Sequence, residues 1–240
     1  MPYREKKMKY QNLREKLVYA GKILCANGQD DLTRGHVSAR IPDNSGLFLM
    51  KPHSVGLDEL TPESLLMIDL EGNVVEGDGR RHSEAFIHTE IYRSRDDVQA
   101  VLHTHPTYCV ALSASGQPLL PVSQPAALFF NSLGTYTDTI NLIRTPEMGA
   151  GVAAALGTNR AVLLRHHGIV CTGSSVEETV IGAIMLENAA MIQMITSATG
   201  QVSELFSEED IVKLQNAIGK QEQFTINFDY LARRINKKQL

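Results

Sequence analysis

The stretch SEAFIHTEIYRSRDDVQAVLHTHP, residues 83–106, decides the fold. Residues 83–94 predict a helix, and Ser83 is a residue type suited to its N-cap. Residues 98–105, VQAVLHTH, predict a β-strand that ends in two histidines. Pro106 then stands where the first turn of a further helix over 106–115 is expected. A strand held between two helices indicates an α/β protein.

The rest of the chain also alternates between helical and extended patterns. Before this stretch we expect a helix over 9–27 that stops at Gly28, strands over 36–41 and 47–52 around a turn at 42–46, and a hairpin over 65–79 that turns at 71–73. After it we expect a loop with a short helix over 117–137, a strand over 139–143, a helix over 146–157, one or two strands over 161–171, a long helix over 175–200, and helices near 207–219 and 228–237.

These elements predict one domain that covers residues 1–240. No repeat, linker or low-complexity segment interrupts the chain, and the strands and helices do not follow a regular βαβ order. The pattern therefore favours a single α/β domain with a mixed or antiparallel sheet.

The composition is that of an ordinary soluble protein. The chain has 43% hydrophobic and 21% charged residues, with a net charge of −4. This balance gives no reason to expect a nucleic-acid or membrane partner. The three cysteines, Cys25, Cys109 and Cys171, are isolated in sequence, which favours a reducing compartment. The charged N-terminus is unlike a signal peptide, and no apolar stretch is long enough to span a bilayer, so we expect a cytoplasmic protein.

His103 and His105 are the first candidate metal ligands. Residues at i and i+2 of a strand project from the same face, so the two imidazoles can share one ion. A pair of this kind alone fits a metal site and a metal-free polar strand end equally well.

A third histidine comes from RHHG, residues 165–168, at the end of another apolar strand. His166 and His167 alternate in direction, so one of them should ligate, and Gly168 lets the backbone turn after His167. Three neutral imidazoles around a divalent ion leave a position open for substrate, which is typical of a catalytic site. His166 is then expected to be a hydrogen-bonded wall residue or a substrate contact.

Glu84 is the candidate carboxylate of the site. Its expected place in the first turn of a helix gives two interpretations, catalysis and simple stabilisation of the helix end.

Two other features resemble functional motifs. MGAGVAAALG, residues 148–157, imitates part of a dinucleotide fingerprint but predicts a closely packed helix of small residues. The methionines Met185, Met191 and Met194 predict core packing or a subunit contact.

The spaced combination of HVS after Gly35, the 83–106 stretch and LLRHHG resembles the class II aldolase/adducin family over about residues 12–200. The resemblance implies a three-layer α/β/α fold with a central mixed, mostly antiparallel sheet. It also implies a homotetramer with active sites between subunits. His103, His105 and His167 would bind a divalent ion, zinc or manganese, and Glu84 would be the catalytic acid/base.

The chain departs from the sugar-phosphate aldolases of this family, such as the fuculose-phosphate and ribulose-phosphate types, where they bind phosphate. His36 replaces the asparagine of their GNxS motif, the TPTG-like turn reads KPHS with His53 and Ser54, and His82 replaces the first serine before Glu84, leaving Ser83. A tyrosine that some aldolases contribute aligns approximately with Gln124. Imidazoles at these substrate-binding positions suit carboxylates or aromatic rings. Arg80 and Arg81 are expected to be surface charges.

These changes resemble the metal-dependent decarboxylases of hydroxylated aromatic or pyridine carboxylates. The predicted function is therefore a metal-dependent carbon–carbon lyase acting on a small molecule, and non-oxidative decarboxylation is the leading hypothesis. Alternatives are an aldolase, epimerase or dehydratase acting on a sugar phosphate or hydroxy-keto acid, and a non-catalytic adducin-like scaffold.

Overall fold

Eight strands form the middle layer of the molecule. A computed structural model, which describes residues 9–200 and 204–238, arranges them in one sheet in the order β4-β3-β2-β1-β5-β8-β7-β6. Neighbouring strands are antiparallel except β6 and β7, so the sheet is mixed and mostly antiparallel, as predicted. The strands are β1 (His36–Ile41), β2 (Asn44–Met50), β3 (Leu66–Asp69), β4 (Val74–Glu76), β5 (Ala100–Thr104), β6 (Leu133–Tyr136), β7 (Ala161–Leu164) and β8 (Gly168–Gly173).

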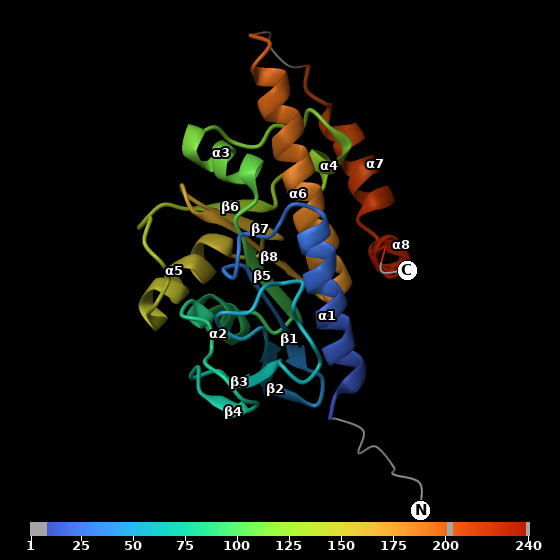
Figure 1. Cartoon of the computed structure of the whole chain (residues 1–240). Coiled ribbons are helices and arrows are strands. Elements are labelled where there is room, and N and C mark those ends of the chain that lie inside the picture. The colour runs from blue at the N-terminus through green and yellow to red at the C-terminus, as the bar shows by residue number, and fades with distance from the viewer. Residues whose placement is uncertain (1–8, 201–203, 239–240) are drawn as a thin grey trace, which may run out of the picture.

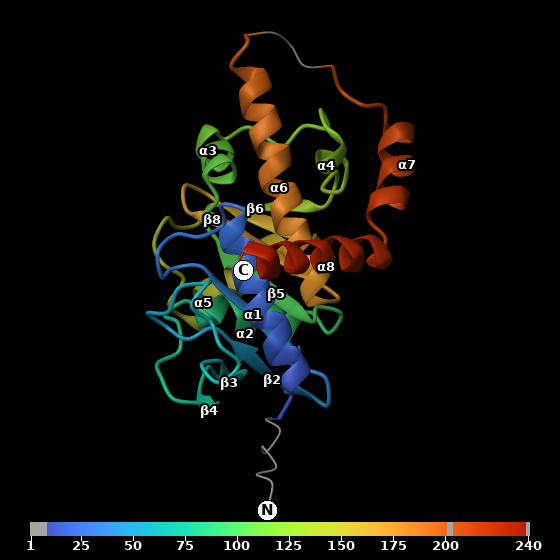
Figure 2. The same cartoon turned by 45° about the vertical axis from the view of Figure 1, so that its right-hand side comes forward.

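Helices cover both faces of this sheet. Helices α1, α6 and α8 lie over one face, and α2 and α5 lie over the other (Figures 1 and 2). Helices α3 and α4 pack on α6, and α7 packs on α4. The predicted three-layer α/β/α fold is therefore confirmed. The helices are α1 (Gln11–Ala26), α2 (Ala85–Ser94), α3 (Thr107–Ser115), α4 (Gln124–Ala127), α5 (Pro146–Leu156), α6 (Val176–Ser197), α7 (Glu208–Ile218) and α8 (Gln221–Lys238).

Alternation along the central strands decides which residues face α2. In β5, Ala100 and Leu102 belong to the hydrophobic core under α1 and α6, and Val101 belongs to the core under α2 and α5. His103 therefore faces the α2 side. Its register partner on β1 is His36, which lies on the same face. The sheet thus brings two histidines that are distant in sequence together beneath α2.

Helix α5 packs closely against α2 through small residues. A Cβ atom at Gly149 would lie only 2.3 Å from the carbonyl oxygen of Phe86, so only glycine permits this approach. The small-residue segment of α5 thus packs helix to helix, which is the interpretation preferred over a dinucleotide fingerprint. Met185 and Met194 of α6 pack against the other core.

Three local expectations were wrong. Residues 139–143 form no strand; the backbone N–H of Ile143 donates instead to the Glu84 carboxylate. Strand β6, at one edge of the sheet, lies within the segment expected to hold only a loop and a short helix. Ser83 is not the N-cap of α2, because the helix begins one residue later and Glu84 occupies the N-cap position.

Helix α6 is the one described helix that is long and apolar enough to cross a membrane by length and composition alone, contrary to the expectation that no stretch would qualify. It buries Val180, Ala183 and Leu186 in the core that covers the sheet. Core packing therefore accounts for its apolar character. The first eight residues, on which the signal-peptide expectation rests in part, lie outside the described residues.

Candidate metal centre

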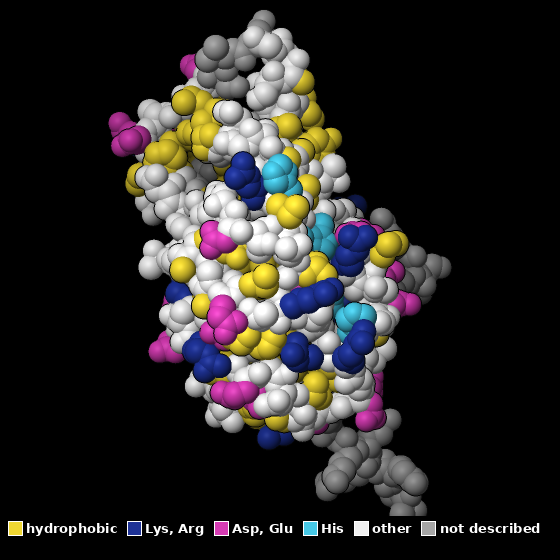
Figure 3. Space-filling model, turned by 90° about the vertical axis from the view of Figure 1, so that its left-hand side faces the viewer, with side chains coloured by type: hydrophobic (Ala, Val, Ile, Leu, Met, Phe, Trp, Pro, Cys, Tyr) yellow, Lys and Arg dark blue, Asp and Glu magenta, His cyan; other side chains and the backbone are white. Residues whose placement is uncertain are grey.

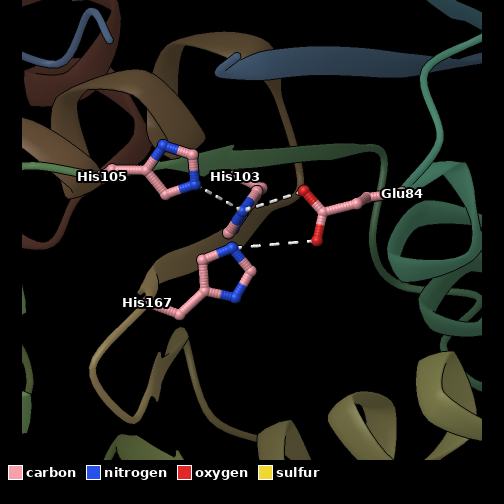
Figure 4. A group of neighbouring side chains, drawn as sticks. All are labelled: Glu84, His103, His105 and His167. Carbon is pink, nitrogen blue, oxygen red and sulfur yellow. Dashed lines mark hydrogen bonds and ion pairs between the residues drawn. The ribbon is translucent and has the colours of Figure 1, made fainter. Parts of the chain in front are cut away.

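Glu84, His103, His105 and His167 converge on one point, with one potential ligand atom from each lying within 4.8 Å of the others (Figure 4). They come from separate parts of the fold. Glu84 precedes α2, His103 is in β5, His105 follows the end of β5, and His167 is in the turn between β7 and β8. The three histidines chosen from the sequence therefore meet in the structure.

The hydrogen bonds behind His103 and His105 determine which ring nitrogens are available. His103 Nδ1 lies 2.9 Å from the Ile169 carbonyl oxygen, and His105 Nδ1 lies 3.1 Å from an Asp31 carboxylate oxygen. Both oxygens accept hydrogen bonds, so each Nδ1 carries the proton and donates. The two Nε2 atoms of the neutral rings then hold lone pairs, although they lie only 3.0 Å apart. Two facing lone pairs repel each other, and a cation between them removes the repulsion.

His167 gives a second sign that the residues fit a metal ion. Both of its ring nitrogens are buried and have no hydrogen-bond partner among the described residues, and Nε2 lies 3.7 Å from Glu84 Oε1. A buried polar atom without a partner costs about 1–3 kcal/mol. A divalent ion bound by three imidazoles would satisfy Nε2, and such a nitrogen donor set suits zinc and other transition metals.

Close contact with β5 explains why a glycine follows His167. A Cβ atom at Gly168 would lie 2.4 Å from the Thr104 carbonyl oxygen and 2.7 Å from the His105 ring. Gly168 therefore allows the two ligand-bearing segments to approach, which is a different reason from the turn expected from the sequence. Residues 165–167 form a turn rather than a continuing strand. The side chain of His166 is exposed, and its backbone N–H donates to Ser113 Oγ.

The Glu84 carboxylate faces the metal centre rather than its own helix. Its side chain caps no helical N–H, and Oε1 accepts a hydrogen bond of 2.8 Å from Ile143. Its Oε2 lies 3.8 Å from His103 Nε2. Burial raises the pKa of Glu84, while the Ile143 hydrogen bond and the electrostatic influence of His167 and Arg144 act in the opposite direction. A buried carboxyl with a raised pKa is suited to carry a proton to a substrate.

Burial also determines the charge state of the three histidines. It lowers the pKa of His103, His105 and His167, although Asp31 opposes this for His105 and Glu84 opposes it for His167. The rings are therefore neutral near pH 7. Neutral imidazole is the form that ligates a metal.

A second cluster of histidines lies beside the first. The His36 ring centroid is 5.0 Å from that of His103 and 4.1 Å from that of His82, and the His82 centroid is 5.6 Å from that of His53. Burial lowers the pKa of His82 to about 3 and also lowers that of His36.

Ser54 is exposed and its hydroxyl contacts His53 Nδ1. Gln124, aligned with an aldolase tyrosine, is exposed at the start of α4.

Lys51 lies beneath this second cluster and was not found from the sequence. It is fully buried, and its ammonium donates to the Thr33 carbonyl oxygen at 2.9 Å. Burial lowers the pKa of Lys51 to about 8. The charge of Lys51 in turn helps to lower the pKa values of His36, His53 and His82. The second cluster therefore lies near Lys51, whereas the first lies near Asp31 and also near Arg34, and Glu84 lies close to both clusters.

A cavity of about 460 Å³ opens at Ser83, the residue that precedes Glu84. Positively charged and histidine side chains gather on this face of the molecule (Figure 3). Arg80 and Arg81, expected to be plain surface charges, line the cavity, and so does Arg144, which no sequence motif indicated. The cavity lining consists of His53, Arg80, Arg81, Ser83 and Arg144. Such a lining suits an anionic small molecule.

Comparison with known proteins identifies the family. Residues 15–194 match the class II aldolase and adducin N-terminal domain. The chain belongs to this family. A 3,4-dihydroxyphthalate decarboxylase from Arthrobacter keyseri is 31% identical over 218 residues, which cover 86% of this chain and 87% of the relative. A 5-deoxy-D-ribulose 1-phosphate aldolase from Bacillus thuringiensis is 28% identical over 207 residues, which cover 86% of this chain and 95% of the relative.

The solved structure of a related aldolase confirms the fold of this chain. The L-fuculose 1-phosphate aldolase from Glaciozyma antarctica superposes with a TM-score of 0.83 at 26% identity, and the match covers 95% of this chain and 89% of the aldolase. Decarboxylases and aldolases of the family both cleave carbon–carbon bonds. The chain is accordingly a metal-dependent lyase.

Proposed function

We propose that this member of the class II aldolase family is a non-oxidative decarboxylase of a hydroxylated aromatic or heteroaromatic carboxylate. The observation that supports it best is the row of His36, His82 and His53, whose neighbouring ring centroids lie 4.1 and 5.6 Å apart and which reaches the cavity at His53. Flat imidazole faces can stack on an aromatic ring. The related 3,4-dihydroxyphthalate decarboxylase, whose named substrate is an aromatic dicarboxylate, agrees with this proposal.

The reaction must stabilise the electron pair left when carbon dioxide departs. His103, His105 and His167 would hold zinc or manganese, whose positive charge stabilises electron density on an adjacent substrate oxygen. Their neutral nitrogens leave that charge undiminished, whereas carboxylate ligands would reduce it.

Glu84 completes the reaction by moving a proton. The carbon–carbon bond breaks, carbon dioxide leaves, and the electron pair that stays on the ring carbon takes a proton from Glu84 to form a C–H bond. Oε1 is held by Ile143, so Oε2 is the oxygen available for proton transfer. Solvent then returns a proton to the carboxylate. Burial raises the pKa of Glu84, which favours its role as the proton donor.

The cavity residues would orient the part of the substrate that does not react. Ser83 and His53 line the cavity with Arg80, Arg81 and Arg144, and His36 and His82 lie beside Glu84. A second carboxylate on the substrate would bind among these donors. Arginine pairs with carboxylates through two parallel hydrogen bonds, which fixes orientation as well as charge.

An aldolase acting on a sugar phosphate is the alternative, and the arginine-lined cavity and the related sugar-phosphate aldolase favour it. In that reaction Glu84 would move the proton of an enediolate. Epimerisation or dehydration would use the same residues in another order. A metal-free scaffold of the adducin type would have no need for four converging ligand groups.

A substrate panel separates these functions. Purified protein loaded with manganese or zinc is mixed with hydroxylated aromatic dicarboxylates and with sugar phosphates, and carbon dioxide and aldehyde are measured separately. We expect carbon dioxide from the aromatic dicarboxylates. Aldehyde from a sugar phosphate, without carbon dioxide from any aromatic acid, would show that the decarboxylase proposal is wrong.

We also propose a homotetramer in the cytoplasm. The tetramer rests on the family resemblance, and the location rests on the three cysteines, all of which are free. Light scattering coupled to gel filtration measures the first, and microscopy of the tagged full chain measures the second.

A further inference from the structure

A buried chain of hydrogen bonds leads from Tyr92 to His36. Tyr92 Oη lies 2.8 Å from Ser38 Oγ, and Ser38 Oγ lies 2.6 Å from His88 Nδ1. His88 Nε2 then lies 2.7 Å from His36 Nδ1. None of the four side chains is more than 1% exposed. Water therefore does not compete for these contacts, and each buried polar group must find its hydrogen-bond partner within the protein.

The hydrogen bonds between Tyr92 and His36 have one favoured donor-to-acceptor direction. If Tyr92 donates to Ser38, Ser38 donates to His88 and His88 donates to His36, every proton lies in a contact of 2.6–2.8 Å. In the reverse direction His88 donates to Ser38. If Ser38 then donates to Tyr92 Oη at 2.8 Å, the buried Tyr92 proton has no other acceptor among the described residues. If Tyr92 instead keeps donating to Ser38, the Ser38 proton is left with the Val101 carbonyl oxygen at 3.5 Å. That contact is too long for a good hydrogen bond. His36 Nδ1 is thus an acceptor, and the proton of the neutral His36 ring resides on Nε2.

The free nitrogen of His36 is the one left for the active site. His36 Nε2 is buried without a hydrogen-bond partner among the described residues. A ring nitrogen of His36 also lies within 4.8 Å of Glu84 and His82 ligand atoms. A protonated Nε2 can donate to the Glu84 carboxylate or to a substrate oxygen, whereas a bare lone pair there would be repelled by the carboxylate.

His82 presents a proton on the same nitrogen. The Glu84 backbone N–H points to His82 Nδ1 over a long contact of 3.4 Å, and this direction favours Nδ1 as the acceptor and the proton on Nε2. By geometry alone, His36, His82 and Glu84 form a second group that could hold a metal. By the position of their protons, the two histidines are donors and have no lone pair to offer an ion.

We propose that Tyr92, Ser38 and His88 hold His36 in its Nε2–H tautomer, so that His36 donates to a substrate oxygen and does not ligate a second metal. His88 is the positioning residue of this arrangement, because it touches His36 and lies behind it. The donation to substrate rests on the proposed function. The tautomer itself does not, since it follows from contacts within the protein.

Nuclear magnetic resonance measures the tautomer directly. Full-length protein labelled with ¹⁵N-histidine and loaded with diamagnetic zinc gives long-range ¹H–¹⁵N correlations that assign the proton of each ring. We expect Nε2–H for His36 and His88, and Nδ1–H for His103 and His105. Nδ1–H at His36 would overturn the proposal whatever the substrate of the enzyme proves to be.

Two variants at position 88 then separate positioning from folding. His88→Gln keeps an amide N–H near the position of Nε2, and His88→Leu removes every donor at similar volume. We expect His88→Leu to lower kcat/KM about 10- to 100-fold, as loss of supporting hydrogen bonds does in active sites, with one zinc still bound per chain. His88→Gln should recover most of that loss. His36 resonances in His88→Gln should keep the Nε2–H pattern.

The outcomes distinguish the two proposals. Equal kcat/KM losses in His88→Leu and His88→Gln, with His36 still in the Nε2–H tautomer, would mean that His88 acts only through packing and would overturn its positioning role. Two zinc ions bound to the wild-type chain, the second broadening or shifting the His36 signals, would also overturn the proposal. Absence of carbon dioxide release with the expected tautomers would contradict the decarboxylase function alone.

Discussion

Two clusters of histidines share one face of the sheet, and they differ in what lies behind each ring. Behind His103 and His105 are oxygen acceptors, the Ile169 carbonyl and the Asp31 carboxylate. Behind His36 is His88, which donates. The first arrangement leaves lone pairs at Nε2, and the second leaves a proton there. The same residue type therefore becomes a metal ligand in one cluster and a hydrogen-bond donor in the other.

The charges around the two clusters follow the same division. Glu84 and Asp31 lie beside the first cluster and favour a cation there. Lys51 and Arg80 lie near the second, and together with burial, the larger cause, their charges lower the pKa of His53. A cation and an anionic substrate are thus directed to neighbouring positions with Glu84 between them. This separation suits a reaction in which negative charge moves from a leaving group toward a metal ion.

Removal of a ligand from the first cluster should have the largest effect. We expect His103→Ala and His167→Ala to lose most bound metal and most activity. The metal affinity should fall by more than about 100-fold, the largest loss usual for residues that only hold a ligand in place. His166→Ala is the matched control, because it removes the neighbouring exposed imidazole. Metal content measured by mass spectrometry decides the outcome. Full metal content in His103→Ala or His167→Ala would remove that residue from the ligand set.

Removal of the Glu84 charge should leave the metal in place and slow the reaction. Glu84→Gln keeps the acceptor for the Ile143 N–H, so we expect normal folding and metal content with a turnover at least about 100-fold slower, the usual contribution of a positioned acid or base. Steady-state kinetics and metal analysis of the same sample test this. Normal turnover would leave Glu84 with a structural role only.

A change behind the first cluster should have an intermediate effect. Asp31→Asn removes the carboxylate that accepts from His105 Nδ1 while keeping nearly the same shape. We expect metal affinity to fall about 10- to 100-fold, as it does when such supporting partners are lost. Competition with a chelator of known affinity gives the value. Asp30→Asn, a change of the same kind at the preceding residue, is the control and should bind metal normally.

A change in the cavity of the second cluster should affect substrate binding alone. Arg80→Gln removes one positive charge from the cavity lining, and we expect KM to rise about tenfold with kcat nearly unchanged, the effect of losing a hydrogen bond to a charged group. Arg93→Gln, on α2 outside the cavity lining, is the control. An equal effect of the two substitutions on KM would mean that Arg80 acts through general charge rather than through the cavity.

The smallest expected effect concerns stability and Lys51. Because burial lowers the pKa of Lys51 from 10.5 to about 8, the unfolded chain holds a proton between these values that the folded chain has released. Stability must then rise with pH in this range. Between pH 8 and 9 wild type should gain about 1 kcal/mol relative to Lys51→Met. Urea unfolding of both proteins at the two pH values measures this difference. An equal change in unfolding free energy for wild type and Lys51→Met would show that burial does not lower the pKa of Lys51.

The sequence predicted those parts of the molecule that depend on local pattern. Alternation along 98–105 indicated that His103 and His105 would share a side, and an apolar strand before His167 indicated a similar position at its end. The family motifs then related these segments to one sheet. Each of these inferences uses residues that are neighbours in sequence or that belong to a recognisable motif.

The remaining features depend on contacts between distant residues. Residues 139–143 have a strand-like pattern, but the sheet already ends at β6 and the backbone of Ile143 binds Glu84. Asp31 and Arg144 belong to no motif, and only the fold brings them to His105 and Glu84. The series of hydrogen bonds behind His36 combines Ser38 of β1 with two residues of α2. None of these pairings leaves a periodic signal in the sequence.

Anomalous X-ray scattering from crystals of the full chain grown with zinc tests the central claim most directly. Data collected on both sides of the zinc absorption edge should show one strong peak per chain, bonded to the Nε2 atoms of His103, His105 and His167 at about 2.0–2.1 Å. A chain with no peak at that position, or with its zinc bound between His36 and His82, would contradict the account.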